Sequence, residues 1–170
     1  MAFSLSRSSA FAFLITVVGI GSTATPAVTA SQTTPAQNAT TPLPRVFLFA
    51  TGGTISNRNG GRLTVEELLQ SVPNLDRRVK AEGEQFANVS SGQITMDQWL
   101  GLARKINDKF KSDKDLAGVV VTSGTDTLEE LAYFLHLTVR DVRPVVVVGS
   151  LRNPSTTGYE GVANPEDGFI

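Results

Sequence analysis

Three short runs of apolar residues recur along the chain, and each stops where glycine, serine or threonine begins. They are Val46–Ala50, Gly118–Thr122 and Val145–Gly149, and Gln85–Val89 is a weaker run of the same kind. The three strong runs do not alternate apolar with polar residues, and such strands are buried on both faces. This pattern is typical of a parallel sheet covered by helices. We therefore predict three strands of a parallel sheet and a fourth, less marked one.

The segments between these runs carry apolar residues at the helical period of about 3.6 residues. They predict helices over Thr64–Val72, Met96–Phe110 and Leu128–Leu135. Thr95 with Gln98, and Thr127 with Glu130, have capping-box spacing, in which two side chains bond each other's backbone N–H at the helix start. Strands that alternate with helices indicate an α/β fold, a mainly parallel sheet flanked by helices in a Rossmann-like, three-layer arrangement.

The first 44 residues differ from the rest, because Arg7 is the only charged residue before Arg45. Residues 1–30 combine this positive charge with an apolar stretch and small residues at its end, the pattern of a secretory signal peptide. A membrane anchor is the alternative, but the stretch is shorter than the roughly 20 residues of a membrane span. Residues 31–44 are polar and uncharged, so we expect a disordered linker before a domain over 45–170. The mature protein is then periplasmic or secreted.

Composition excludes several classes of function. The chain has 170 residues, a net charge of −1, no cysteine and a single histidine, His136. No disulfide framework, thiol nucleophile, cysteine–histidine metal site or Ser-His-Asp triad is therefore expected. The balance of 15 basic and 16 acidic residues argues against nucleic acid or, after leader cleavage, a membrane as the main partner. A small molecule remains the expected ligand.

The candidate chemistry lies just after two of the strands, where parallel sheets bind their ligands. Residues 50–56 (ATGGTIS) place two glycines before Thr54, and glycines permit a sharp turn with unobstructed N–H groups. Residues 122–127 (TSGTDT) place Thr125 and Asp126 at the start of a helix, which favours anionic groups. A tight turn and a helix cap would each explain one segment alone. A phosphate-binding loop is disfavoured because both glycine-rich nucleotide signatures are missing.

Together the two segments are more specific. ATGGTIS at 50–56 and SGTDTLEELAYF at 123–134 resemble the two signature motifs of the bacterial-type L-asparaginases, the type II periplasmic enzymes. Residues 83–107 (GEQFANVSSGQITMDQWLGLARKIN) and 144–156 (PVVVVGSLRNPST) are also similar to that family. The resemblance extends from Pro44 to about Asn164, and it implies the fold of the family's N-terminal α/β domain.

The resemblance implies a role for four residues. Thr54 matches the threonine nucleophile. Thr125 matches a second threonine that works with a downstream lysine to activate a nucleophile or water, and it is also expected to contact the substrate. Asp126 matches the aspartate that holds the substrate's α-amino group, and Ser91 matches the serine that binds its α-carboxylate. The alternative interpretation of Ser91 is a plain loop serine, and the functional one is favoured. The resemblance implies no metal ligand and no cofactor.

The implied reaction is hydrolysis of the side-chain amide of L-asparagine, through an acyl-enzyme on Thr54, to L-aspartate and ammonia. L-Glutamine is the competing substrate. The family assembles as homo-oligomers, in which a smaller second domain completes the active site across a subunit interface.

The chain also departs from the family pattern. Ser123 stands where many members have histidine, and Gly92 stands where members often have Gln or Glu. Members are longer than this chain, and their catalytic lysine comes after the position of Ile170, so we expect a truncated or frame-shifted sequence and an incomplete fold. Residues 164–170 are not expected to form a helix, because Pro165 disfavours helical conformation in the residue before it.

Two functions of different class follow from these observations. The first is an asparaginase-type amidohydrolase. The alternative is a catalytically inactive fragment that at most binds the amino acid, since no lysine follows Lys114 in this sequence.

Overall fold

The computed structural model describes residues 42–160 and 162–169. The predicted signal peptide and most of the predicted linker lie outside the described residues. Within the described residues, no helix is both long enough and apolar enough to cross a membrane.

The domain is built on a four-stranded sheet in the order β4-β1-β5-β6. Its strands are β1 (Arg45–Gly52), β4 (Lys80–Val89), β5 (Leu116–Thr122) and β6 (Val145–Val148). All three neighbouring pairs are parallel, which confirms the predicted fold class. The strand predicted at Gln85–Val89 is longer than expected, because β4 is an edge strand whose first half alternates exposed and partly buried residues.

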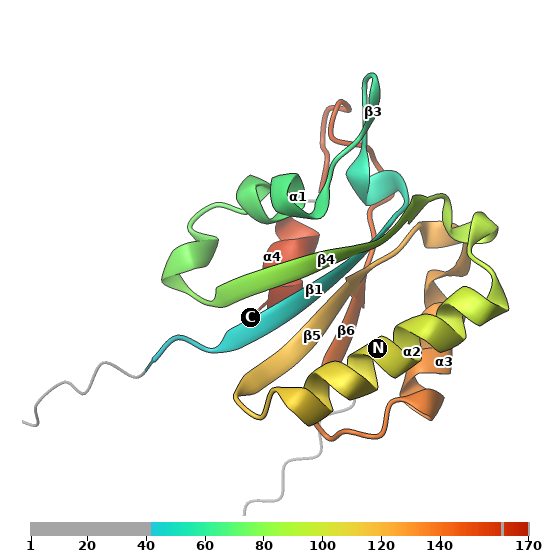
Figure 1. Cartoon of the computed structure of the whole chain (residues 1–170). Coiled ribbons are helices and arrows are strands. Elements are labelled where there is room, and N and C mark those ends of the chain that lie inside the picture. The colour runs from blue at the N-terminus through green and yellow to red at the C-terminus, as the bar shows by residue number, and fades with distance from the viewer. Residues whose placement is uncertain (1–41, 161, 170) are drawn as a thin grey trace, which may run out of the picture. The chain divides into compact units, whose positions relative to one another are not determined.

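Both faces of the sheet are buried, which explains the uninterrupted apolar runs. Along β1, Val46, Leu48 and Ala50 belong to one hydrophobic cluster, whereas Phe47 and Phe49 belong to the other. The first cluster lies under the helices α1 (Val65–Ser71) and α4 (Ala163–Phe169), and the second lies under α2 (Met96–Ser112) and α3 (Leu128–Thr138). Figure 1 shows these two helix pairs on opposite sides of the sheet. The predicted three layers are therefore present.

The helix starts follow the predicted capping chemistry at α2 but not at α3. The hydroxyl of Thr95 accepts the N–H of Gln98, and the Gln98 side chain accepts the N–H of Thr95. Thr64 and Glu67 form the same box at α1. The box predicted for Thr127 is wrong, because Thr127 ends the 3-10 turn η4 (Thr125–Thr127), and its hydroxyl makes no capping bond.

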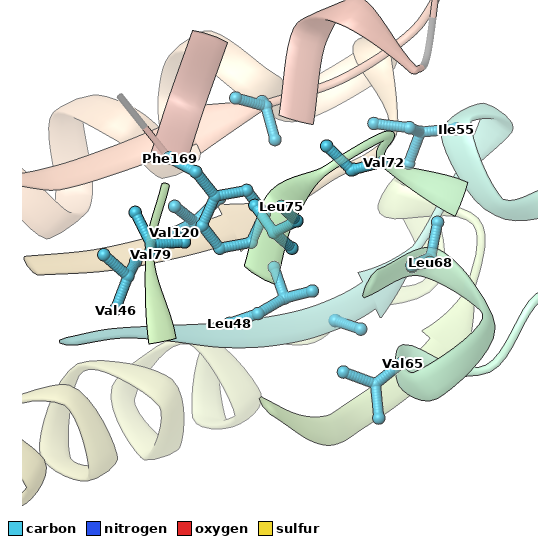
Figure 2. Packing of buried hydrophobic residues seen from close by; sticks show 12 residues of the cluster. Val46, Leu48, Ile55, Val65, Leu68, Val72, Leu75, Val79, Val120 and Phe169 are labelled. Atoms are coloured by element: carbon cyan, nitrogen blue, oxygen red, sulfur yellow. The ribbon is translucent and has the colours of Figure 1, made fainter. Parts of the chain in front are cut away.

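The prediction that the last residues are not helical is also wrong, since Ala163–Phe169 forms α4. Pro165 lies in the first turn, where backbone N–H groups have no partner within the helix, so the missing N–H costs no hydrogen bond. Pro165 and Phe169 are both buried. Figure 2 shows Phe169 pointing into the first cluster, among Leu75, Val79 and Val120. Packing against the sheet thus overrides the local preference.

Short elements gather at the carboxyl ends of the strands. The 3-10 turn η1 (Thr54–Ser56) follows β1, and a small hairpin of β2 (Asn57–Arg58) and β3 (Gly61–Arg62) follows it. The turn η3 (Ser91–Gln93) follows β4, and η4 follows β5. A further turn, η2 (Leu75–Arg77), joins α1 to the amino end of β4.

Candidate active site

Three turns meet at the carboxyl edge of the sheet, and glycines make their close approach possible. A Cβ atom on Gly53 would overlap the backbone N and Cα of Gly124, and a Cβ on Gly124 would lie 2.6 Å from Ser91 Oγ. Gly53 also has a φ of +83°, which L side chains rarely adopt. The two threonine motifs are therefore in direct backbone contact, and the Ser91 turn lies against the second of them.

An irregularity in β4 brings Ser91 to this point. Ala50 pairs with Gln85 and Gly52 pairs with Val89, so four residues of β4 advance against two of β1. The Gln85 side chain fills the irregularity by donating to the carbonyl of Ala50 at 3.1 Å. The N–H of Gly53 then donates to the carbonyl of Val89 at 2.9 Å. The end of β4 is thus fixed to the first motif two residues before Ser91.

The first turn is held by the protein's own hydrogen bonds. Thr54 begins η1 and is partly buried. The hydroxyl and the N–H of Ser56 both donate to the carbonyl of Gly53, at 3.0 and 3.1 Å. The phenol of Tyr159 donates to the carbonyl of Ile55 at 2.8 Å. The backbone on both sides of Thr54 is therefore bonded.

The second turn offers its side chains to solvent. Thr125 and Asp126 are exposed in η4, immediately before α3. Ser123, in contrast, is fully buried, its N–H donates to the carbonyl of Val148 at 2.8 Å and its hydroxyl donates to Gly124 O at 3.2 Å. Ser123, which stands where many family members have histidine, is thus bonded to backbone carbonyls through both its N–H and its hydroxyl. At the same edge the hydroxyl of Thr51 donates to Thr122 O at 2.7 Å, which ties β1 to β5.

Two buried hydroxyls beside these turns have no hydrogen-bond partner within the described part of the chain: Ser91 Oγ and Thr127 Oγ1. Ser91 is only 2% exposed. A buried polar atom without a partner costs free energy, so these two hydroxyls are candidates to bond a ligand. Both hydroxyls lie at the N-terminal end of α3 or against its preceding turn, where free N–H groups favour an anion.

Comparison with known proteins decides the family. The family model described as "Asparaginase, N-terminal" matches residues 45–169. The chain belongs to this asparaginase family. It is similar to L-asparaginase 2 of Bacillus subtilis and of Escherichia coli, each 42% identical over 132 residues that make up 72% of this chain and 35% and 37% of those proteins. A Haemophilus influenzae protein named "Probable L-asparaginase periplasmic" is 37% identical, with coverage of 72% and 37%.

A solved structure supports the same relationship. The probable cytoplasmic L-asparaginase of Campylobacter jejuni superposes with a TM-score of 0.68 at 36% identity, over 74% of this chain and 38% of that one. The chain thus spans little more than a third of the length of the asparaginases that it matches.

Sequence reasoning missed several residues that build this asparaginase-family site. Arg62 in the hairpin donates from Nε to Asn57 Oδ1 at 2.8 Å, and its two Nη atoms donate to the Asn88 carbonyl and the Ser90 hydroxyl at 2.5 and 3.3 Å. It therefore links the hairpin to the segment before Ser91. Tyr159 was missed for the same reason as Arg62, because neither residue belongs to a recognisable motif. Among the described residues, no group of three or more His, Cys, Asp or Glu is close enough to hold a metal ion.

Proposed function

We propose that this chain forms the nucleophile-bearing part of an asparaginase-type amidohydrolase, which converts L-asparagine and water to L-aspartate and ammonia. The observation that carries the proposal is the contact between the two threonine turns at Gly53 and Gly124. The Ser91 hydroxyl, which has no partner among the described residues, lies against this contact. Membership of the asparaginase family supports the same reaction.

Thr54 is the proposed nucleophile. Its Oγ forms a bond to the side-chain amide carbon, the C–N bond breaks, and the hydroxyl proton leaves with the nitrogen as ammonia. Water then attacks the acyl-enzyme, the ester bond breaks, and one proton of the water returns to Thr54 Oγ. The negative charge that develops on the substrate oxygen needs backbone N–H donors other than that of Gly53, which already donates to the Val89 carbonyl. The proposed role of Thr125 is to move protons in these steps.

The second turn and Ser91 bind the rest of the amino acid. The exposed carboxylate of Asp126 accepts a charge-assisted hydrogen bond from the α-ammonium group. The Ser91 hydroxyl, which has no partner in the described chain, donates to the α-carboxylate. L-Glutamine has the same two α-groups, so this arrangement admits it as an alternative substrate.

The location and assembly of the protein are further proposals. The signal-peptide pattern of residues 1–30 supports export to the periplasm, and the name of one relative includes the word periplasmic. Assembly as a homo-oligomer follows from the family resemblance.

The decisive experiment measures ammonia release from L-asparagine by the full chain, by Thr54→Ala and by Thr138→Ala. Thr138 is a matched control because it ends α3, where its hydroxyl donates to Phe134 O. We expect Thr54→Ala to lose at least about a thousandfold in rate and the control to lose little. Equal rates in Thr54→Ala and the parent would disprove the nucleophile.

Calorimetry with L-aspartate separates catalysis from binding. Asp126→Asn is expected to weaken binding by about tenfold or more, because a hydrogen bond to a charged group contributes roughly 1.5–3 kcal/mol. Glu129→Gln, an exposed charge change in the first turn of α3, is the control. Binding without any ammonia release from the folded parent would establish the alternative, an inactive chain that binds the amino acid.

A further inference from the structure

The segment between β6 and α4, of which residues 149–160 and 162 are described, reaches across the carboxyl edge to the first motif. The Tyr159 hydroxyl donates to the carbonyl of Ile55, 104 positions earlier in the chain, at 2.8 Å. Ser155 Oγ accepts the N–H of Asn59, in the hairpin, at 3.4 Å. Figure 1 shows this loop rising beside the hairpin that carries β3. One loop therefore contacts both the Thr54 turn and the segment that follows it.

The loop has an internal frame that holds Tyr159 in place. The carboxylate of the next residue, Glu160, accepts the N–H groups of Leu151 and Arg152 at 2.6 and 3.1 Å and the Ser150 hydroxyl at 3.1 Å. Asn164 in α4 donates to the carbonyl of Gly149 at 2.7 Å. Residues near the two ends of the loop are thus bonded to each other, and Tyr159 directly precedes the carboxylate that accepts three of these bonds.

The phenol is a donor at every pH at which the protein is expected to work. Burial, helped by the negative charge of Glu160, raises the pKa of Tyr159 to about 12. The charge that acts on the phenol is that of Glu160, which lies 3.5 Å from Arg152, and the bond of Tyr159 to the first motif is to an uncharged carbonyl. The Tyr159–Ile55 hydrogen bond therefore does not switch with pH near neutrality.

We propose that Tyr159 is a positioning residue for Thr54. The inference rests on the proposed function and adds a residue that the motifs do not contain. Ile55 is the residue after Thr54, and its carbonyl belongs to the peptide bond between Ile55 and Ser56. Fixing this carbonyl therefore limits rotation of the short turn η1. The bonds from Ser56 to Gly53 are internal to that turn, whereas the bond from Tyr159 comes from a separate part of the chain.

The test compares Tyr159→Phe with Tyr133→Phe in the full chain. These are the two tyrosines of the sequence, and Tyr133 is 66% exposed on α3. The first readout is hydrogen exchange of the Ser56 and Asn57 amides, which donate within the turn to Gly53 and Thr54. We expect about fivefold faster exchange in Tyr159→Phe only, as the loss of one hydrogen bond predicts.

The second readout is the kinetics of ammonia release. We expect kcat to fall by about fivefold in Tyr159→Phe with KM changed less than twofold, because the turn that holds the nucleophile is loosened and Asp126 and Ser91 are not. Unchanged amide exchange, or faster exchange with unchanged kcat, would overturn the proposal. Absence of ammonia release from the parent chain would instead overturn the proposed function, and amide exchange would still decide whether Tyr159 holds the turn.

Discussion

The two threonine turns use the same residue types but differ in how their polar groups are bonded. In the first turn, Ser56 and Tyr159 bond the carbonyls on either side of Thr54. In the second, Thr125 and Asp126 face solvent, and the hydroxyl of Thr127, like that of Ser91 in the adjacent turn η3, is buried without a partner in the described chain. The carbonyls that flank Thr54 are thus bonded within the protein, whereas buried hydroxyls at and beside the second turn lack a partner among the described residues.

This difference matches the division of work in the proposed reaction. A nucleophile gains from being held in one orientation before the substrate arrives, because that removes the entropic cost of ordering it during the reaction. A binding site needs donors and acceptors that the protein has not already used. The contrast therefore predicts that changes to the first turn reduce stability, whereas changes to the second reduce ligand binding.

The largest effect is expected where the two turns touch. Gly53→Ala should destabilise the domain by more than about 3 kcal/mol, because its Cβ would overlap the backbone of Gly124 and nothing flexible can move aside. Gly60→Ala is the matched control, since Gly60 has a φ of +84° but no atom within 4 Å of the added Cβ. The control should cost only the left-handed backbone penalty of about 1–2 kcal/mol. Urea unfolding measures both, and equal losses would show that the glycine contact is loose.

Two buried serines give a sharper and smaller comparison. Ser56→Ala should cost about 1 kcal/mol, because Ser56 donates to the carbonyl of Gly53. Ser91→Ala should leave the free energy of unfolding unchanged or raise it slightly, because it removes a buried hydroxyl that has no partner in the described chain. Adding L-aspartate should then stabilise the Ser56→Ala variant as much as it stabilises the parent. It should stabilise the Ser91→Ala variant less. A loss of stability in Ser91→Ala without ligand would mean that its hydroxyl is already satisfied.

The sequence predicted the elements that depend on local pattern. The runs at Val46 and Val119 predicted strands buried on both faces, and the Thr95 box predicted the start of α2. It could not predict α4, because the burial of Phe169 against the sheet is a tertiary effect that overrides the local influence of Pro165.

The parts of the site that sequence reasoning missed have a common cause. The Gln85 irregularity, the Arg62 link and the Tyr159 bond each join segments that are distant in the chain, and their residues have no fixed spacing to one another. Thr54, Ser91, Thr125 and Asp126 could be proposed from the sequence because each lies within a short contiguous stretch that resembles the asparaginase family. The residues that hold those stretches in place are visible only once the chain is folded.

The smallest predicted effect concerns pH and the frame around Tyr159. Burial on its own raises the pKa of Glu160, but hydrogen bonds from its own backbone N–H, from Arg152, Leu151 and the Ser150 hydroxyl outweigh it and hold the pKa below the ordinary value of 4.5. A carboxylate with a lowered pKa in the folded state stabilises the fold above its unfolded pKa, and this contribution disappears as pH falls through the folded value. Glu160→Gln should therefore lower stability at neutral pH, and its difference from the parent should shrink below about pH 4.

Urea unfolding between pH 3 and 7 measures this difference, and Glu129→Gln removes one negative charge elsewhere as the control. Because the loop that Glu160 closes carries Tyr159 to the first turn, the same variant should also speed exchange of the Ser56 amide at neutral pH. A difference in stability that does not change with pH would show that the carboxylate charge is irrelevant to the loop. The position of Thr54 would then depend on the Tyr159 hydrogen bond alone and not on the charge of Glu160. The first turn would be held less firmly than its comparison with the second turn implies.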